Sequence, residues 1–152
     1  MKIWTAVFLT GVLGLAAMAP ATSTVPEPVL PESLRWASPP GNPAVQGAWV
    51  IGSEDAEGLY AFRVMLKHGG RIPVHTHPDT RHTVVLSGTL YVGFGVTEDD
   101  SQMVAIPPLG VYVAPANQPH YLRASDGDVL YQESGTGPTG TQWRHPPPEA
   151  DR

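Results

Sequence analysis

Between residues 46 and 133, glycine, proline and aspartate divide the chain into short apolar segments, each too short for an ordinary helix. These segments are rich in Val, Ile, Leu, Tyr and Phe and fall at 46–51, 60–66, 72–76, 82–87, 89–95, 102–106, 110–114, 119–124 and 128–133. Several of these segments alternate between more polar and more apolar residues, as in residues 89–92. This alternation is typical of half-buried strands. Evenly spaced short strands predict an all-β sandwich or barrel, with helix confined to about one turn near 98–101.

The composition agrees with one small domain and excludes several classes of function. The 152 residues include 17 Pro and 16 Gly, which argues against a helical bundle. The chain has no Cys, so a disulfide framework, a cysteine zinc site and a thiol nucleophile are excluded. Its net charge of -5 has the wrong sign for binding a nucleic-acid backbone, so we expect no nucleic-acid partner. Six His are then the best remaining metal ligands.

Residues 1–21 have the pattern of a secretory signal peptide. Lys2 precedes an apolar run from Ile3 to Met18, and Ala19-Pro20-Ala21 fits the small-residue rule for cleavage. We expect cleavage after Ala21 and a periplasmic or secreted protein that is not attached to the membrane. The alternative is an uncleaved anchor, which the short apolar run disfavours, because a spanning helix needs about 20 apolar residues.

Three further segments follow the predicted signal peptide. Residues 22–43 contain six Pro, too many for regular structure, and are interpreted as an extended arm laid over the domain. Residues 44–143 form the predicted β-domain. Residues 144–152, which include three consecutive Pro, are predicted to be a disordered tail.

Two histidines lie two residues apart at the predicted end of one strand. Residues at this spacing point to the same face of a strand, so His75 and His77 are expected to aim at one point. The best third candidate is His120, in a tight turn that leads into another strand. The plainer alternative is that the His75–His77 pair is accidental and that His120 only caps its turn.

The spacing around these histidines resembles the two motifs of the cupin superfamily. The first is Gly70-x4-His75-x-His77, followed by Val84-Val85-Leu86-Ser87-Gly88, and the second is Gly110-x4-Pro115-x-Asn117-x2-His120. The resemblance covers about residues 36–143 and is closest to small bacterial cupins described as quercetin dioxygenase-like. It implies an antiparallel jelly-roll barrel that holds one divalent metal ion, with His75, His77 and His120 as ligands.

The chain departs from the usual cupin pattern at one ligand position. Arg81 stands where the family commonly has a metal-binding Glu, and a guanidinium cannot ligate a metal. His82 could replace the missing ligand if its strand were shifted by one residue or bulged, and Asp79 could reach in from its turn. We favour a three-His site with open positions. The remaining alternative is a cupin that has lost its metal together with the Glu.

Three neutral imidazoles leave coordination positions open and the full charge on the ion, which favours an anionic oxygen ligand. Iron, manganese, nickel, copper and zinc all suit imidazole. The resemblance favours an oxygenase acting on a small enolic, aromatic or carboxylate compound. The alternatives are a metal-dependent lyase or isomerase, a non-catalytic protein that binds a small ligand or metal, and a structural cupin dimer. We also expect a homodimer, because cupins commonly pair through their sheets.

Three further side chains are candidates for contacting a small-molecule ligand. Arg63 could clamp a carboxylate if the face with Ala61 and Met65 lines the cavity, although a solvated arginine is the plainer interpretation. Tyr91 and Tyr121 are candidate proton donors, and the plainer interpretation is that they are packing groups.

Overall fold

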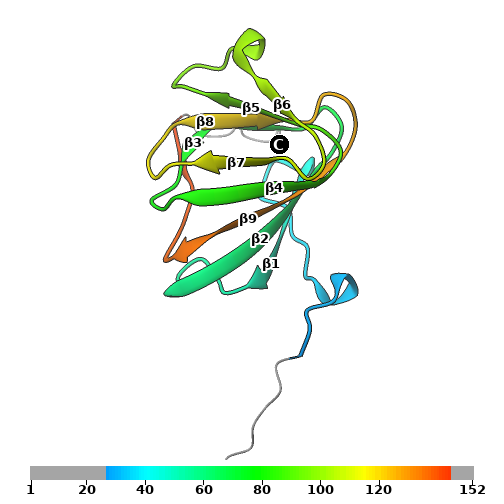
Figure 1. The fold of residues 1–152 in the computed structure, drawn as a ribbon, viewed down its shortest axis with the longest axis vertical. Coiled ribbons are helices and arrows are strands. Elements are labelled where there is room, and N and C mark those ends of the chain that lie inside the picture. Colours follow the sequence, from blue (N-terminus) through cyan, green and yellow to red (C-terminus); the bar gives the residue numbers. More distant parts are fainter. Residues whose placement is uncertain (1–26, 145–152) are drawn as a thin grey trace, which may run out of the picture.

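The computed structural model describes residues 27–144, so the predicted signal peptide and all of the predicted tail except Arg144 lie outside the described part. The fold is almost entirely β, as the sequence predicted. Two antiparallel five-stranded sheets face each other (Figure 1). No helix in the described range is both long enough and apolar enough to span a membrane.

The first sheet has the strand order β1-β2-β9-β4-β7. Its strands are β1 (Val45–Ile51), β2 (Gly58–Leu66), β9 (Val129–Gly137), β4 (Arg81–Ser87) and β7 (Val111–Ala114). The second sheet has the order β10-β3-β8-β5-β6. Its strands are β10 (Gln142–Trp143), β3 (Arg71–Thr76), β8 (His120–Arg123), β5 (Leu90–Phe94) and β6 (Val104–Ile106).

Each of the nine predicted segments contains or overlaps a strand, so the segmentation by glycine and proline is confirmed. The structure adds β10, which the sequence did not reveal because it is only two residues long. It also adds a 3-10 helix η1 (Pro31–Ser33). The predicted helical turn near 98–101 overlaps the 3-10 helix η2 (Asp100–Gln102), which starts two residues later and ends one residue later.

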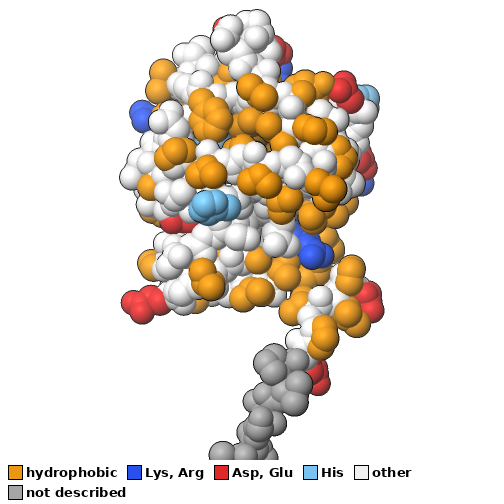
Figure 2. Space-filling model, viewed as in Figure 1, with side chains coloured by type: hydrophobic (Ala, Val, Ile, Leu, Met, Phe, Trp, Pro, Cys, Tyr) orange, Lys and Arg blue, Asp and Glu red, His pale blue; other side chains and the backbone are white. Residues whose placement is uncertain are grey.

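The core lies between the two sheets, and burial alternates along β4 and the first part of β9. Val64 and Leu66 on β2, Val85 on β4 and Leu90 on β5 are buried there, together with Leu122 on β8. The residues between them point outward. On β7 the outward residues Val111 and Val113 are apolar, and Figure 2 shows hydrophobic side chains gathered over this region of the first sheet.

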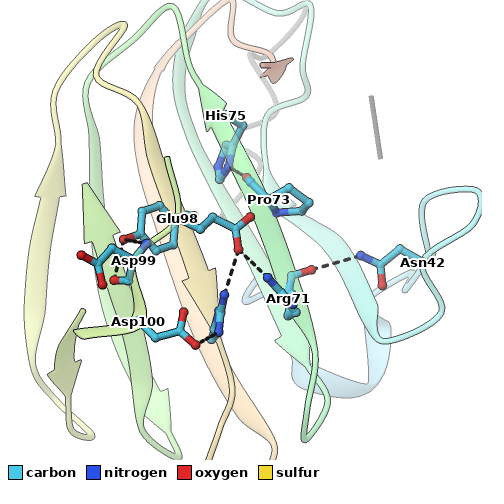
Figure 3. A network of polar contacts seen from close by, with 9 residues as sticks. Asn42, Arg71, Pro73, His75, Glu98, Asp99 and Asp100 are labelled. Carbon is cyan, nitrogen blue, oxygen red and sulfur yellow. Dashed lines mark hydrogen bonds and ion pairs between the residues drawn. The ribbon is translucent and has the colours of Figure 1, made fainter. Parts of the chain in front are cut away.

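The described part of the predicted arm lies along one edge of the barrel. Ala37 makes an isolated antiparallel bridge with Gly47 on β1, through hydrogen bonds of 2.9 and 2.8 Å. Asn42 donates a hydrogen bond from Nδ2 to the backbone oxygen of Arg71, 3.2 Å away (Figure 3). These contacts attach the arm to both sheets.

The loop between β5 and β6 is attached to the outer face of the second sheet by an ion network. Glu98 accepts hydrogen bonds from Arg71 at 2.5 Å and from Arg123 at 2.9 Å (Figure 3). Arg123 also pairs with Asp100. The network is at least partly exposed to solvent, so its individual pairs contribute about 0–1 kcal/mol each.

Candidate metal centre

The three predicted histidines come from adjacent strands of the second sheet. His75 on β3 lies directly opposite His120 on β8, and His77 follows the end of β3. A register irregularity between Ile72 and His75 is a bulge, which lets both of these side chains face the interior. All three histidines are buried.

The three imidazoles form one compact cluster. A ring nitrogen from each lies within 4.8 Å of the ring nitrogens of the other two. The ring centroids are 4.8 Å apart for His75 and His77, 4.2 Å for His75 and His120, and 5.1 Å for His77 and His120. No other group of three or more metal-ligating side chains is found within residues 27–144.

Backbone carbonyls fix the orientation of all three rings. The Nδ1 atoms of His75, His77 and His120 lie 2.7, 2.7 and 3.0 Å from the backbone oxygens of Pro73, Gly140 and Gln118. A carbonyl can only accept, so each neutral ring carries its proton on Nδ1 and has a free lone pair on Nε2. The Nε2 atoms of His77 and His120 are buried and have no hydrogen-bond partner. Buried, unpartnered Nε2 atoms on rings that backbone carbonyls hold in place fit a divalent metal ion.

The surroundings keep the three histidines neutral. Burial, together with the charges that His120 and His77 would carry, lowers the pKa of His75 to about 3. Burial and the nearby Arg81 guanidinium lower the pKa of His77 to about 3. Burial also lowers the pKa of His120. Because only the neutral ring ligates a metal, protons compete weakly for this site near neutral pH.

Arg81 occupies the interior of the barrel instead of pointing away. It is 7 % exposed and donates a hydrogen bond from Nη1 to Oε2 of Glu133 at 2.6 Å. Its Nη2 atom donates to Oγ1 of Thr139 at 2.8 Å and to the oxygen of Gly140 at 3.1 Å. Burial by itself would lower the pKa of Arg81, but Glu133, Tyr60 and Asp79 together more than offset this effect and the pKa is raised. The guanidinium is therefore charged.

Glu133 is a functional candidate that the sequence reasoning missed. It lies on β9 and is 4 % exposed, on the same face of the strand as the buried Val129 and Tyr131. That period-two pattern was visible in the sequence and places position 133 inside the barrel. The signal in the sequence that could have identified Glu133 is an acidic residue at the end of a buried strand face.

His82 and Asp79 do not join the cluster. His82 is exposed and pairs with Val113 and Ser134 on the outer face of the first sheet, so its prediction as a fourth ligand is wrong. The register of β4 turns Arg81 inward, and the next residue must then point outward. Asp79 accepts hydrogen bonds from Tyr60 at 2.6 Å and from Thr139 at 2.5 Å.

The three predicted substrate-binding side chains also lie elsewhere. Arg63 faces outward from β2 and donates from Nε to the Gln132 side chain at 3.1 Å. Tyr91 faces outward from β5 and donates to Asp126. Tyr121 is buried on the outer side of the second sheet, where its hydroxyl bonds the backbone of Asp99. None of the three lines the cavity beside the histidines, so these predictions are corrected.

Tyr121 also explains a glycine inside β5. Gly93 lies opposite Tyr121, and a Cβ atom at Gly93 would be 2.2 Å from the tyrosine ring. The register of β5 with β8 is regular through Gly93. The glycine provides room for the aromatic ring.

A cavity of about 450 Å³ opens beside the cluster. This volume is in the range of small-molecule sites. His75, His77, Arg81 and Glu133 line its polar part. Its other walls include Trp49, Phe62 and Trp143, and arm residues of which Arg35 is one.

Comparisons with known proteins show similarity at the level of structure. No family model matches the sequence, and no curated protein matches it. The polyketide cyclase RemF from Streptomyces resistomycificus is 14 % identical, with a TM-score of 0.66 over 83 % of this chain and 90 % of that chain. The DMSP lyase DddQ from Ruegeria pomeroyi is 18 % identical, with a TM-score of 0.63 over 76 % of this chain and 63 % of that chain.

A third similar structure is an RmlC-like cupin from Shewanella frigidimarina, which is 13 % identical with a TM-score of 0.57. The match covers 70 % of this chain and 86 % of that cupin. The specific likeness to quercetin dioxygenase-like cupins stays a prediction. Together, the two facing antiparallel sheets and these structural neighbours show that the chain has the fold of the cupin superfamily.

Proposed function

We propose that this chain is a metal-dependent cupin enzyme that binds one divalent ion and acts on a small oxygen-containing anion. The observation that carries the proposal is the orientation of the three imidazoles. Each Nδ1 is held by a backbone carbonyl, and the ring nitrogens converge within 4.8 Å. Such an arrangement supports metal binding by His75, His77 and His120.

An ion held by three neutral imidazoles would act as a Lewis acid toward an oxygen atom of the ligand. Iron, manganese, nickel, copper and zinc all suit this donor set. Arg35 lines the cavity and supports an anionic ligand, whereas the charge of Arg81 is balanced by Glu133. The aromatic walls formed by Trp49, Phe62 and Trp143 supply apolar surface.

The buried carboxylate of Glu133 favours proton-transfer chemistry, as in a lyase or isomerase, over the oxygenase reaction that the resemblance implies. A general base beside an open ligand position is what such reactions need. Two of the structural neighbours are named as a polyketide cyclase and a DMSP lyase. Oxygenation stays the second candidate, carried by the sequence resemblance.

Elemental analysis of the purified protein tests metal binding. We expect about one divalent ion per chain in the wild type and much less in His75→Ala. His82→Ala is the matched control, because it removes an exposed histidine from the neighbouring region of the other sheet. A wild-type protein that holds far less than one ion per chain after incubation with each candidate metal would contradict the proposal.

Export is a second part of the proposed function and rests on the pattern of residues 1–21 alone. Intact-mass measurement on protein recovered from a producing cell tests it. We expect a chain that begins at Thr22. A mass that includes Met1 to Ala21 in the mature protein would contradict cleavage.

A further inference from the structure

The ion pair between Arg81 and Glu133 is buried beside the histidine cluster, and the metal site does not require it. Their side chains are 8 % and 5 % exposed, and the atoms Nη1 and Oε2 are 2.6 Å apart. Both side chains line the cavity of about 450 Å³ that also exposes His75 and His77. The pair therefore lies where a ligand of the cluster would bind.

The carboxylate beside the histidines comes from a different strand than in the usual cupin pattern. The usual ligand position on β4 holds the cation Arg81, and the carboxylate comes instead from Glu133 on β9. Glu133 lies outside the group of converging ligand atoms, which contains only the three histidines. Its negative charge nevertheless acts on the pKa values of His75 and His120, so it lies close to the centre without completing it.

Stability does not account for this arrangement. Burying two charges costs several kcal/mol of desolvation per ion, and well-packed apolar residues in the same place are often equally stable or more stable. The cavity wall around the pair already contains Phe62 and Tyr131, so apolar residues would fit there. A role in chemistry explains why the charges are present.

We propose that Glu133 is the proton acceptor of this site and that the substrate is a small carbon acid, with a C–H bond next to a carbonyl group. This inference rests on the proposed metal-dependent function. In the step, the substrate C–H bond breaks, the proton goes to the Glu133 carboxylate, and the electron pair moves to the carbonyl oxygen to form an enolate. No oxidant or reductant takes part.

Arg81 is a positioning residue in this reaction. Its hydrogen bond goes to Oε2 of Glu133, and no protein donor in the described range is found for Oε1. Arg81 is itself fixed by Thr139 and Gly140, and its Nε lies 3.8 Å from Asp79. The guanidinium thus holds one carboxylate oxygen in place, and the Glu133 side chain lines the cavity.

The first test is covalent labelling of the metal-loaded protein with 3-bromopyruvate, followed by peptide mass spectrometry. The carboxylate oxygen of Glu133 attacks the CH2 carbon, the C–Br bond breaks, bromide leaves and an ester forms. The chain has no Cys, so no thiol competes for the reagent. We expect the ester at Glu133, and we expect its loss when excess pyruvate is present.

The second test measures exchange of the methyl protons of pyruvate in D2O by NMR. Glu133→Gln is expected to lose about a hundredfold in exchange rate, the typical contribution of a general base. Because Glu133→Gln removes the nearer of the two carboxylates that pair with Arg81, the double variant Arg81→Gln/Glu133→Gln provides a neutral pair that also lacks the base. Glu57→Gln, which removes an exposed carboxylate, should exchange like the wild type.

The role of Arg81 is tested by separate variants. Arg81→Gln should slow both labelling and exchange, and Arg81→Lys, which restores the cation, should recover part of both. Equal labelling in Arg81→Gln and the wild type would overturn the positioning role.

Metal content measured on the same samples separates the two proposals. A wild type that binds no metal contradicts the proposed function. A wild type that binds metal, but is labelled only on exposed carboxylates or exchanges pyruvate protons no faster than Glu133→Gln, overturns the role of Glu133 and leaves metal binding intact.

Discussion

Arg81 and Glu133 form a buried ion pair, 2.6 Å from Nη1 to Oε2, at the place where a cupin metal site commonly receives its carboxylate ligand. Arg81 therefore does not exclude a metal ion from the histidines, because Glu133 balances its charge within the barrel. The three histidines remain convergent beside the pair. The result is a cluster of neutral donors with a cation and an anion next to it.

The charge of Arg81 should weaken metal binding, and Arg81→Glu should strengthen it. The variant replaces a cation near His77 by a carboxylate at the usual ligand position. The metal-free variant should lose about 3–5 kcal/mol of folding stability, because Glu133 is left buried without its cation. Metal competition titrations and urea denaturation measure the two effects. The account is wrong on this point if the metal affinity of Arg81→Glu equals or falls below that of the wild type.

The metal-free protein should lose stability as the pH falls from about 6.5 toward 3. His75 and His77 have their pKa lowered from 6.5 to about 3 in the folded chain, so the unfolded chain binds protons in this interval and the folded chain does not. Each histidine should contribute about 1.4 kcal/mol per pH unit within the interval. Urea denaturation at several pH values gives the slope.

Two variants test the dependence of the unfolding free energy on pH: His75→Asn, and His68→Asn as its control. The first variant removes a buried imidazole and should flatten the pH dependence. The second removes an exposed one and should leave the slope unchanged. The same slope in His75→Asn as in the wild type would show that His75 is not held neutral.

Tyr121 should matter for stability and not for the metal centre. Tyr121→Phe removes the hydroxyl that bonds the backbone nitrogen and oxygen of Asp99, which should cost about 1 kcal/mol or more. Metal content should not change, because the side chain is on the outer side of the second sheet. Loss of metal from a folded Tyr121→Phe would reinstate this residue as part of the site.

Gly93→Ala should be destabilising because the new methyl group meets the Tyr121 ring at 2.2 Å. The expected loss is about 1–3 kcal/mol, as for other overpacked positions. Thermal or urea unfolding measures it. Gly93→Ala in a Tyr121→Leu background is the control, in which the added cost of the alanine should shrink.

The sequence predicted the strands and the histidine triad because both depend on short-range patterns. The period of two aims His75 and His77 together, and turn residues divide the strands. Period two does not say which face of a strand is inside, so the sequence leaves Arg63 and Tyr91 open between ligand binding and a plainer role. The structure places both side chains on outer faces. The hydrogen-bond partners of the Arg81 side chain come from residues 133–140, more than 50 positions away, and only the fold brings them together.

X-ray absorption spectroscopy of the zinc-loaded protein tests the central claim most directly, because it counts the imidazole ligands of the bound ion. The account predicts three imidazole nitrogens at about 2.0–2.1 Å, with any further ligands from solvent. Loss of this signal is expected in His77→Ala and its retention in His82→Ala. A zinc ion bound by fewer than three imidazoles in the wild type, or one whose spectrum is changed by His82→Ala and not by His77→Ala, would contradict the account.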